Sequence, residues 1–134
     1  MNKQKCGDER PILVAGCGVS GRAAARLAAR LGRPFSILDQ KDSPELRAFL
    51  ETLPREPERL FLGERAGDSL PRFGLAVLSP GFRKGNPILS AIRKSADRVA
   101  GELEFALEHC GKPWIGITGT NGKTTTTELT AELF

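Results

Sequence analysis

The chain has 134 residues, of which 40% are hydrophobic and 27% charged, a composition typical of a globular protein rather than a disordered one. Its length suits one domain of ordinary size, and no apolar run approaches the length needed to cross a membrane. The formal net charge of +4 is spread along the sequence without a block of Lys and Arg. This distribution favours phosphorylated small molecules as partners, and neither nucleic acid nor a membrane is expected.

The three cysteines, Cys6, Cys17 and Cys110, cannot all pair with one another and lack the spacing of metal ligands. Such usage favours a reducing compartment. The apolar run before Cys17 covers only residues 12–15, which is far shorter than the hydrophobic region of a signal peptide. We therefore expect a cytoplasmic protein, and we expect it to be a monomer.

The first part of the chain has the pattern of a strand, a helix and a second strand. Residues 11–15 form an apolar run that suits a buried parallel strand. Residues 20–31 carry apolar side chains spaced along one stripe, and Gly32 follows where a helix ends. Residues 34–39 form the next apolar run. This order predicts two parallel strands joined by a right-handed crossover.

A glycine-rich stretch, residues 16–21, lies between the first expected strand and the helix and has the pattern G-x-G-x-x-G. Asp39 ends the second expected strand. Together these features are the fingerprint of a dinucleotide site, where a tight turn and a helix N-terminus hold a pyrophosphate. The fingerprint specifies a nucleotide diphosphate but not which one. Alternatively, the glycines only permit close packing of helix on strand, and Asp39 caps a loop.

The middle of the chain continues the alternation of strands and helices. We expect strands at residues 59–63, 75–79 and 98–100, and helices at residues 43–53, 86–96 and 101–110. Ser43 and Asn86 are each followed by proline, as expected for an N-cap residue with proline in the first turn. The predicted fold class is α/β, a Rossmann-like open and mostly parallel sheet flanked by helices and followed by a P-loop strand, loop and helix.

The turn Ser79-Pro80-Gly81 ends the strand expected at residues 75–79. In an open parallel sheet, the loops at the carboxyl ends of the strands form the ligand crevice. We therefore expect this turn on the same rim as the glycine-rich stretch at residues 16–21. Turn formation alone explains a Ser-Pro-Gly sequence about equally well.

A second phosphate-binding pattern stands near the end of the chain. Residues 114–118 have the pattern of a short apolar strand, and a glycine-rich turn and the start of a helix follow. Lys123 would add a charged donor for a phosphate, and Thr124 can offer its hydroxyl to a magnesium ion. The general P-loop pattern has a glycine where this chain has Ile117. A plain strand-to-helix turn with a solvated lysine and capping threonines is the alternative.

The stretch Gly119-Thr120-Asn121-Gly122-Lys123-Thr124-Thr125 resembles the ATP-binding signature of the Mur ligase family, which builds the peptide of peptidoglycan. The resemblance covers the whole chain and rests on residues 16–21, 37–39, 77–81, 86–87, 101–104 and 116–125. In that family a Rossmann-like N-terminal domain holds the UDP of the substrate, a central domain binds ATP, and a C-terminal domain binds the incoming amino acid. The resemblance implies a UDP-binding domain at residues 1–111 and the truncated start of the ATP-binding domain at residues 112–134.

Two sets of site residues follow from the resemblance, by matching motif. The first set would bind the UDP part of the substrate: Gly18, Val19, Ser20, Gly21, Asp39, Gln40, Lys41, Ser79, Pro80 and Gly81. The second set would bind the phosphates of ATP: Gly119, Thr120, Asn121, Gly122, Lys123, Thr124 and Thr125. Within the second set, Lys123 and Thr124 would act in catalysis, and Thr124 would bind Mg²⁺. How Gln40 and Lys41 hold the uracil base stays open.

The resemblance implies ATP-dependent addition of D-glutamate to UDP-N-acetylmuramoyl-L-alanine, with Mg²⁺ as cofactor. The substrate carboxylate would take a phosphoryl group from ATP, and the amine of D-glutamate would then attack to form an amide. The protein contributes mainly positioning and charge neutralisation to the first step. Because the chain stops at Phe134, we expect a fragment that binds the UDP part of the substrate but is inactive as a ligase.

Three other interpretations stay open. The glycine pattern and Asp39 also suit an NAD(P)-binding oxidoreductase domain, although a nicotinamide site has no use for a second phosphate loop. A nucleotide-sensing module without catalysis would share the same motifs. A neighbouring Mur ligase could add a different amino acid, because residues beyond Phe134 would make that choice.

Overall fold

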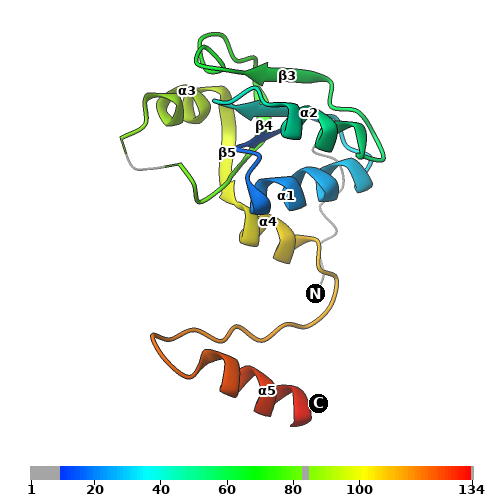
Figure 1. The fold of residues 1–134 in the computed structure, drawn as a ribbon, viewed down its shortest axis with the longest axis vertical. Coiled ribbons are helices and arrows are strands. Elements are labelled where there is room, and N and C mark those ends of the chain that lie inside the picture. The colour runs from blue at the N-terminus through cyan, green and yellow to red at the C-terminus, as the bar shows by residue number, and fades with distance from the viewer. Residues whose placement is uncertain (1–9, 83–84, 134) are drawn as a thin grey trace.

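The computed structural model describes residues 10–82 and 85–133, so Cys6 and Phe134 lie outside the described residues. Its strands are β1 (Ile12–Ala15), β2 (Phe35–Asp39), β3 (Arg59–Leu62), β4 (Phe73–Leu78) and β5 (Ala96–Gly101). Its helices are α1 (Val19–Arg30), α2 (Pro44–Glu51), α3 (Pro87–Ser95), α4 (Glu102–Glu108) and α5 (Lys123–Leu133). The strands form one parallel sheet in the order β3-β2-β1-β4-β5, which confirms the predicted Rossmann-like α/β fold (Figure 1).

Helices cover both faces of this sheet. Side chains of α1, α2 and α4 pack on one face with Ile12 and Val14 of β1. Side chains of α3 and of the loop after β3 pack on the other face with Leu13 and Ala15. Because successive side chains of a strand point to opposite faces, a strand covered on both faces is apolar throughout. All four residues of β1 are accordingly buried.

The local signals for helix ends are confirmed. Gly32 follows α1 with a φ of +68°, a conformation that suits glycine. The side chain of Ser43 caps α2 by accepting a hydrogen bond from the N–H of Leu46 at 3.2 Å. The side chain of Asn86 caps α3 by accepting from the N–H of Ile88 at 3.1 Å. These caps satisfy N–H groups that the first turn of a helix leaves without a partner.

The last strand of the sheet is longer than the expected residues 98–100. β5 pairs with β4 from Phe73 opposite Ala96 to Leu78 opposite Gly101. Its sequence carries Asp97 and Arg98 beside small apolar residues, which hides the pattern of a strand. Pairing with the backbone of β4 gives this edge strand its length, because ladder hydrogen bonds do not depend on side-chain type.

The strand expected at residues 114–118 is wrong for this structure, which has no strand there. Trp114 and Ile115 are 59% and 62% exposed. A strand needs a neighbour for its backbone hydrogen bonds, and this segment lies outside the sheet order. Helix α5 forms as expected but has no buried residue, and Figure 1 shows it standing apart from the sheet.

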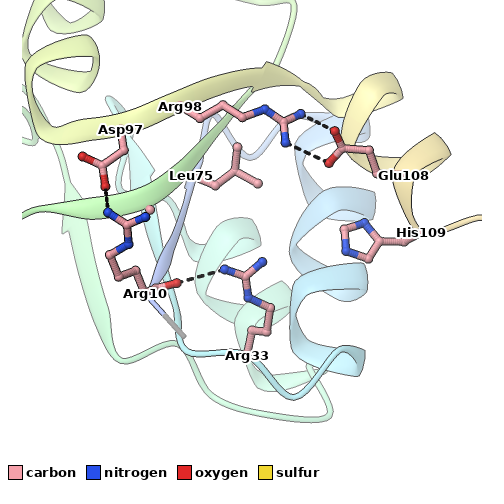
Figure 2. A pocket seen from close by; sticks show the side chains of 8 residues that line it. Arg10, Arg33, Leu75, Asp97, Arg98, Glu108 and His109 are labelled. Atoms are coloured by element: carbon pink, nitrogen blue, oxygen red, sulfur yellow. Dashed lines mark hydrogen bonds and ion pairs between the residues drawn. The ribbon is translucent and has the colours of Figure 1, made fainter. Parts of the chain in front are cut away.

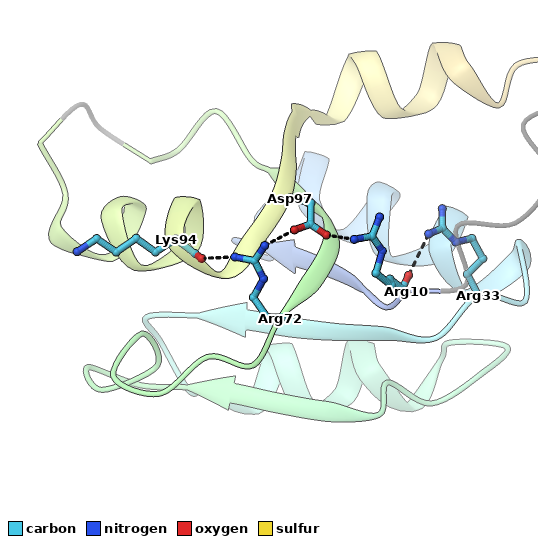
Figure 3. Close-up of polar contacts among 5 residues, drawn as sticks. All are labelled: Arg10, Arg33, Arg72, Lys94 and Asp97. Carbon is cyan, nitrogen blue, oxygen red and sulfur yellow. Dashed lines mark hydrogen bonds and ion pairs between the residues drawn. The ribbon is translucent and has the colours of Figure 1, made fainter.

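A network of ion pairs joins the segments at the amino edge of the sheet (Figure 3). Asp97 pairs with both Arg10 and Arg72. Arg72 also donates to the carbonyl of Lys94 at 2.9 Å, and Arg33 donates to the carbonyl of Arg10 at 3.0 Å. Arg10 and Arg72 are largely exposed, so their ion pairs with Asp97 add little stability in water. The network ties the starts of the strands together without forming a core.

Helix α4 gives a direct check of which face is buried. Phe105 is fully buried, whereas Leu103, two residues earlier, is 69% exposed. We expect Phe105→Ala to lower the free energy of unfolding by about 3–5 kcal/mol, because it leaves a cavity in the core. Leu103→Ala is the matched control and should change it by no more than about 0.5 kcal/mol. Urea denaturation followed by circular dichroism measures both values, and equal losses would contradict this packing of α4.

Candidate functional site

The glycine-rich loop between β1 and α1 brings helix and strand into unusually close contact. Gly16 has a φ of +85°, which turns the chain sharply after β1. A Cβ atom at Gly21 would lie 1.7 Å from the carbonyl oxygen of Gly16, so no side chain fits there. A Cβ atom at Gly18 would instead meet no heavy atom within 4 Å. Gly16 and Gly21 therefore allow the tight turn between β1 and α1, and Gly18 leaves open space beside that turn.

No side chain caps the N-terminus of α1 by a hydrogen bond. Its N-cap residue is Gly18, which makes no side-chain hydrogen bond, and its first turn holds no acidic residue. Helices α2 and α3 carry the caps Ser43 and Asn86, and α4 has two glutamates in its first turn. The uncapped N–H groups and the helix dipole make the start of α1 suitable for an anion.

Asp39, at the end of β2, clamps two loops together. Its carboxylate accepts a hydrogen bond from the N–H of Cys17 at 2.7 Å and another from the N–H of Lys41 at 2.9 Å. The glycine-rich loop is thereby fixed to the loop that follows β2. Burial, and next the charge of Asp39, raises the pKa of the Cys17 thiol to about 12. Cys17 is therefore a neutral structural residue rather than a reactive thiol.

A cleft of about 220 Å³ opens at the carboxyl edge of the sheet, above the ends of β1, β2 and β4. Its lining residues are Gly16, Gly18, Asp39, Gln40, Lys41, Ser79, Gly81 and Phe82. The chain runs from β1 to β2 on one side and returns to β4 on the other, so the cleft lies where the strand order reverses. Open parallel sheets bind their ligands at this position. We call this hollow the carboxyl-edge cleft.

The carboxyl-edge cleft brings together six of the ten residues expected to bind UDP: Gly18, Asp39, Gln40, Lys41, Ser79 and Gly81. Val19, Ser20 and Gly21, in the first turn of α1, and Pro80, in the turn after β4, are adjacent in sequence but do not line it. The side chain of Val19 is 92% exposed. Phe82 was missed by sequence reasoning. The only signal for it is its position directly after the Ser-Pro-Gly turn.

A larger hollow of about 420 Å³ lies at the opposite, amino edge of the sheet (Figure 2). Arg10, Arg33 and Arg98 line it together with Asp97, Glu108 and His109. Arg98 pairs there with Glu108, and with Glu104 at 2.6 Å. Arg10 and Arg98 are thus paired with acidic side chains, whereas Arg33 donates to the carbonyl of Arg10 and its buried Nε has no hydrogen-bond partner among the described residues. The starts of β4 and β5 border this hollow, and the glycine-rich loop does not line it. Size alone does not make it the better ligand site.

His109, the only histidine, ends α4 beside that amino-edge hollow. Its Nδ1 lies 2.8 Å from the carbonyl oxygen of Phe105, and its ring packs edge-on against the ring of Phe105. The ring nitrogen closes a carbonyl that the last turn of the helix leaves without a partner. This geometry gives His109 a structural role.

The second set of expected residues, the phosphate loop at residues 119–125, is exposed in this structure. Gly122 has a φ of +77° and leads directly into α5. The ammonium group of Lys123 donates to the carbonyl oxygen of Gly119 at 2.5 Å. The lysine therefore folds back over its own loop.

A magnesium ion finds few ligands in the described part of the chain. Thr124 offers one hydroxyl, and residues 10–82 and 85–133 contain no group of three His, Cys, Asp or Glu that could hold a metal ion. Magnesium prefers six oxygen ligands in octahedral geometry. These residues alone do not form a complete magnesium site.

In the same described part, no helix is both long enough and apolar enough to cross a membrane.

Curated proteins with one shared name are similar to this chain. The UDP-N-acetylmuramoylalanine–D-glutamate ligase of Synechococcus sp. (strain JA-3-3Ab) is 43% identical over 124 residues, 90% of this chain and 26% of that protein. The ligase of the same name from Microcystis aeruginosa is 43% identical over 125 residues, 90% of this chain and 27% of that protein. The one from Caldanaerobacter subterraneus is 39% identical over 126 residues, 94% of this chain and 28% of that protein.

The chain is a homologue of these ligases. The similarity supports the predicted resemblance over the NAD(P) alternative, because it includes both the glycine-rich loop and the region of the phosphate loop. The chain spans about a quarter of the length of these relatives. No family model matches it.

Two of the three glycines in the glycine-rich stretch, Gly18 and Gly21, allow a matched test of its geometry. Gly21→Ala should lower the free energy of unfolding by at least about 3 kcal/mol, because the new methyl group collides with the backbone of Gly16. Gly18→Ala is the control, since its methyl group enters open space, and it should cost no more than about 1 kcal/mol. Thermal unfolding by calorimetry measures both, and a tolerated Gly21→Ala would contradict the contact between α1 and the turn after β1.

Proposed function

We propose that the carboxyl-edge cleft binds the UDP part of a nucleotide-linked substrate. The observation that carries the proposal is the uncapped start of α1 beside the open face of Gly18. The backbone N–H groups of Val19 and Ser20 would donate to the pyrophosphate, and the helix dipole would favour its charge. The turn at residues 79–81 would lie beside the same phosphates.

The base and ribose would lie toward the loop after β2. Asp39, Gln40 and Lys41 line that side of the cleft. Asp39 would act mainly by holding the loop, because both of its oxygens already accept backbone hydrogen bonds. Gln40 and Lys41 keep exposed side chains that can meet the uracil. The relatives are named for a UDP-linked substrate, which favours uridine over adenosine in this cleft.

The activity that we propose for the whole ligase is ATP-dependent addition of D-glutamate to UDP-N-acetylmuramoyl-L-alanine, within peptidoglycan synthesis in the cytoplasm. Residues 1–111 would bind the UDP end of the substrate, and residues 112–134 would begin the part that binds ATP. Lys123 would neutralise charge on the transferring phosphoryl group. Gly119, Thr120, Asn121, Gly122, Thr124 and Thr125 would surround the phosphates, and Thr124 would supply one oxygen to Mg²⁺.

Binding to the 134-residue chain tests the UDP site. Isothermal titration calorimetry should detect UDP, only weak binding of uridine, and no binding of NAD, because the site is built around a pyrophosphate and a uracil. Gly18→Ala should weaken UDP by about tenfold, since its methyl group enters the space that the phosphates need. Gly101→Ala is the matched control, because Gly101 is also an N-cap glycine with open space around it but does not line the cleft. Micromolar NAD binding without UDP binding would reverse the assignment.

The phosphate loop requires a test in a complete ligase. We expect a chimera that carries residues 1–134 in place of the matching part of the Synechococcus relative to release phosphate from ATP only when UDP-N-acetylmuramoyl-L-alanine and D-glutamate are both present. Lys123→Ala should lower its turnover at least about 100-fold, the scale seen when one preorganised charge-stabilising group is lost. Lys112→Ala, in the linker before the loop, is the control and should leave turnover unchanged. Near-normal turnover with Lys123→Ala would contradict the role of this loop.

A further inference from the structure

A side-chain hydrogen bond joins the carboxyl-edge cleft to the start of α3. The amide nitrogen Nδ2 of Asn86 donates to the amide oxygen Oε1 of Gln40 at 2.9 Å. Gln40 follows β2 and lines the cleft, whereas Asn86 lies 46 positions later in the sequence as the N-cap of α3. An asparagine that serves only as a helix cap needs no such partner.

The direction of the Asn86 amide is fixed by the helix that it caps. The backbone N–H of Ile88 can only donate, so the Asn86 atom that it meets at 3.1 Å must be the oxygen Oδ1. The NH₂ group of Asn86 is then the end that faces Gln40. Pro87 stands in the first turn of α3 and holds the backbone there in a helical conformation. A rotation of the Asn86 amide by 180° would lose both hydrogen bonds at once.

The orientation of the Gln40 side-chain amide follows from the same argument. The NH₂ group of Asn86 can only donate, so Gln40 must present its oxygen to it. The NH₂ group of Gln40 is thereby turned away from Asn86, and its Nε2 has no hydrogen-bond partner within residues 10–82 and 85–133. Gln40 lines both the carboxyl-edge cleft and a hollow of about 270 Å³, and Asn86 lines only the second of these.

We propose that Asn86 is a positioning residue that turns the NH₂ group of Gln40 toward the carboxyl-edge cleft, where it recognises a carbonyl oxygen of the base. The proposal rests on the function proposed above, that the cleft holds a uridine diphosphate. Uracil carries a carbonyl oxygen at the ring position where cytosine carries an NH₂ group. A fixed donor at Gln40 pairs with that carbonyl but faces another donor in cytosine, and an unpaired polar group costs binding free energy.

The substitution Asn86→Asp reverses this polarity and keeps the cap. Aspartate is as good an N-cap residue as asparagine, so α3 should remain formed. One oxygen of the introduced carboxylate accepts from Ile88, and the other can only accept from Gln40. The Gln40 amide must then turn its NH₂ group toward α3 and its oxygen toward the cleft. The cleft should lose its preference for a base carbonyl and gain one for a base NH₂ group.

Calorimetric titration of UDP and CDP into the 134-residue chain tests the proposal through the ratio of the two dissociation constants. The unsubstituted chain should bind UDP about tenfold more tightly than CDP, and Asn86→Asp should bring the ratio to about one or below. The added negative charge weakens both nucleotides alike, so it does not move the ratio. Ser43→Asp is the control, because it puts the same charge on the N-cap of α2, and it should keep the ratio of the unsubstituted chain.

Two results would overturn the inference while leaving the UDP site in place. One is equal binding of UDP and CDP by the unsubstituted chain. The other is an Asn86→Asp chain that remains folded by circular dichroism, binds UDP and keeps the original ratio. Absence of any UDP binding to the unsubstituted chain is a different failure, since it would refute the proposed function itself.

Discussion

The contact between the first turn of α1 and the turn after β1 is the constraint on which the rest of this structure depends. Because Gly21 has no side chain, the first turn of α1 can pack directly against the carbonyl of Gly16. Even one methyl group at Gly21 would collide with that carbonyl. This approach sets the direction of α1, whose alanines then pack closely on the sheet. The same approach aims the uncapped N–H groups of α1 over the carboxyl ends of the strands.

The carboxyl-edge cleft follows from that constraint together with two clamps. Asp39 holds the glycine-rich loop to the end of β2, and Asn86 holds Gln40 to the start of α3. The backbone bond from Ser79 to Ala15, 3.0 Å long, brings the turn after β4 alongside the end of β1. Three loops that are distant in sequence are thus fixed before any ligand arrives, which lowers the entropy that binding must offset.

Much of this fold could be predicted from the sequence because its signals are local. The glycine pattern at residues 16–21, the caps Ser43 and Asn86, and the apolar run of β1 each depend on a few neighbouring residues. The strand expected at residues 114–118 failed because a strand also needs a partner, which a local pattern cannot supply. The extent of β5 was underestimated for the same reason, since pairing with β4 defines it.

The candidate site could be predicted only in part. Motif matching found Gly18, Asp39, Gln40, Lys41, Ser79 and Gly81, because the loops at one edge of a parallel sheet share a rim. It could not find Phe82 in the lining, or the hydrogen bond from Asn86 to Gln40, because both depend on how separate loops meet. Nor could it show that a larger hollow, lined by the ion-paired side chains of Asp97 and Arg98, lies at the opposite edge of the sheet.

These two hollows allow the central claim to be tested directly. In ¹⁵N-labelled protein, titration with UDP followed by NMR should shift the backbone amides of Val19, Ser20, Gln40 and Gly81 together and saturably. The amides of Arg33, Asp97 and His109, at the amino edge, should not respond. Saturable shifts confined to the amino edge, with Val19 and Ser20 unmoved, would contradict the assignment of the nucleotide to the carboxyl-edge cleft.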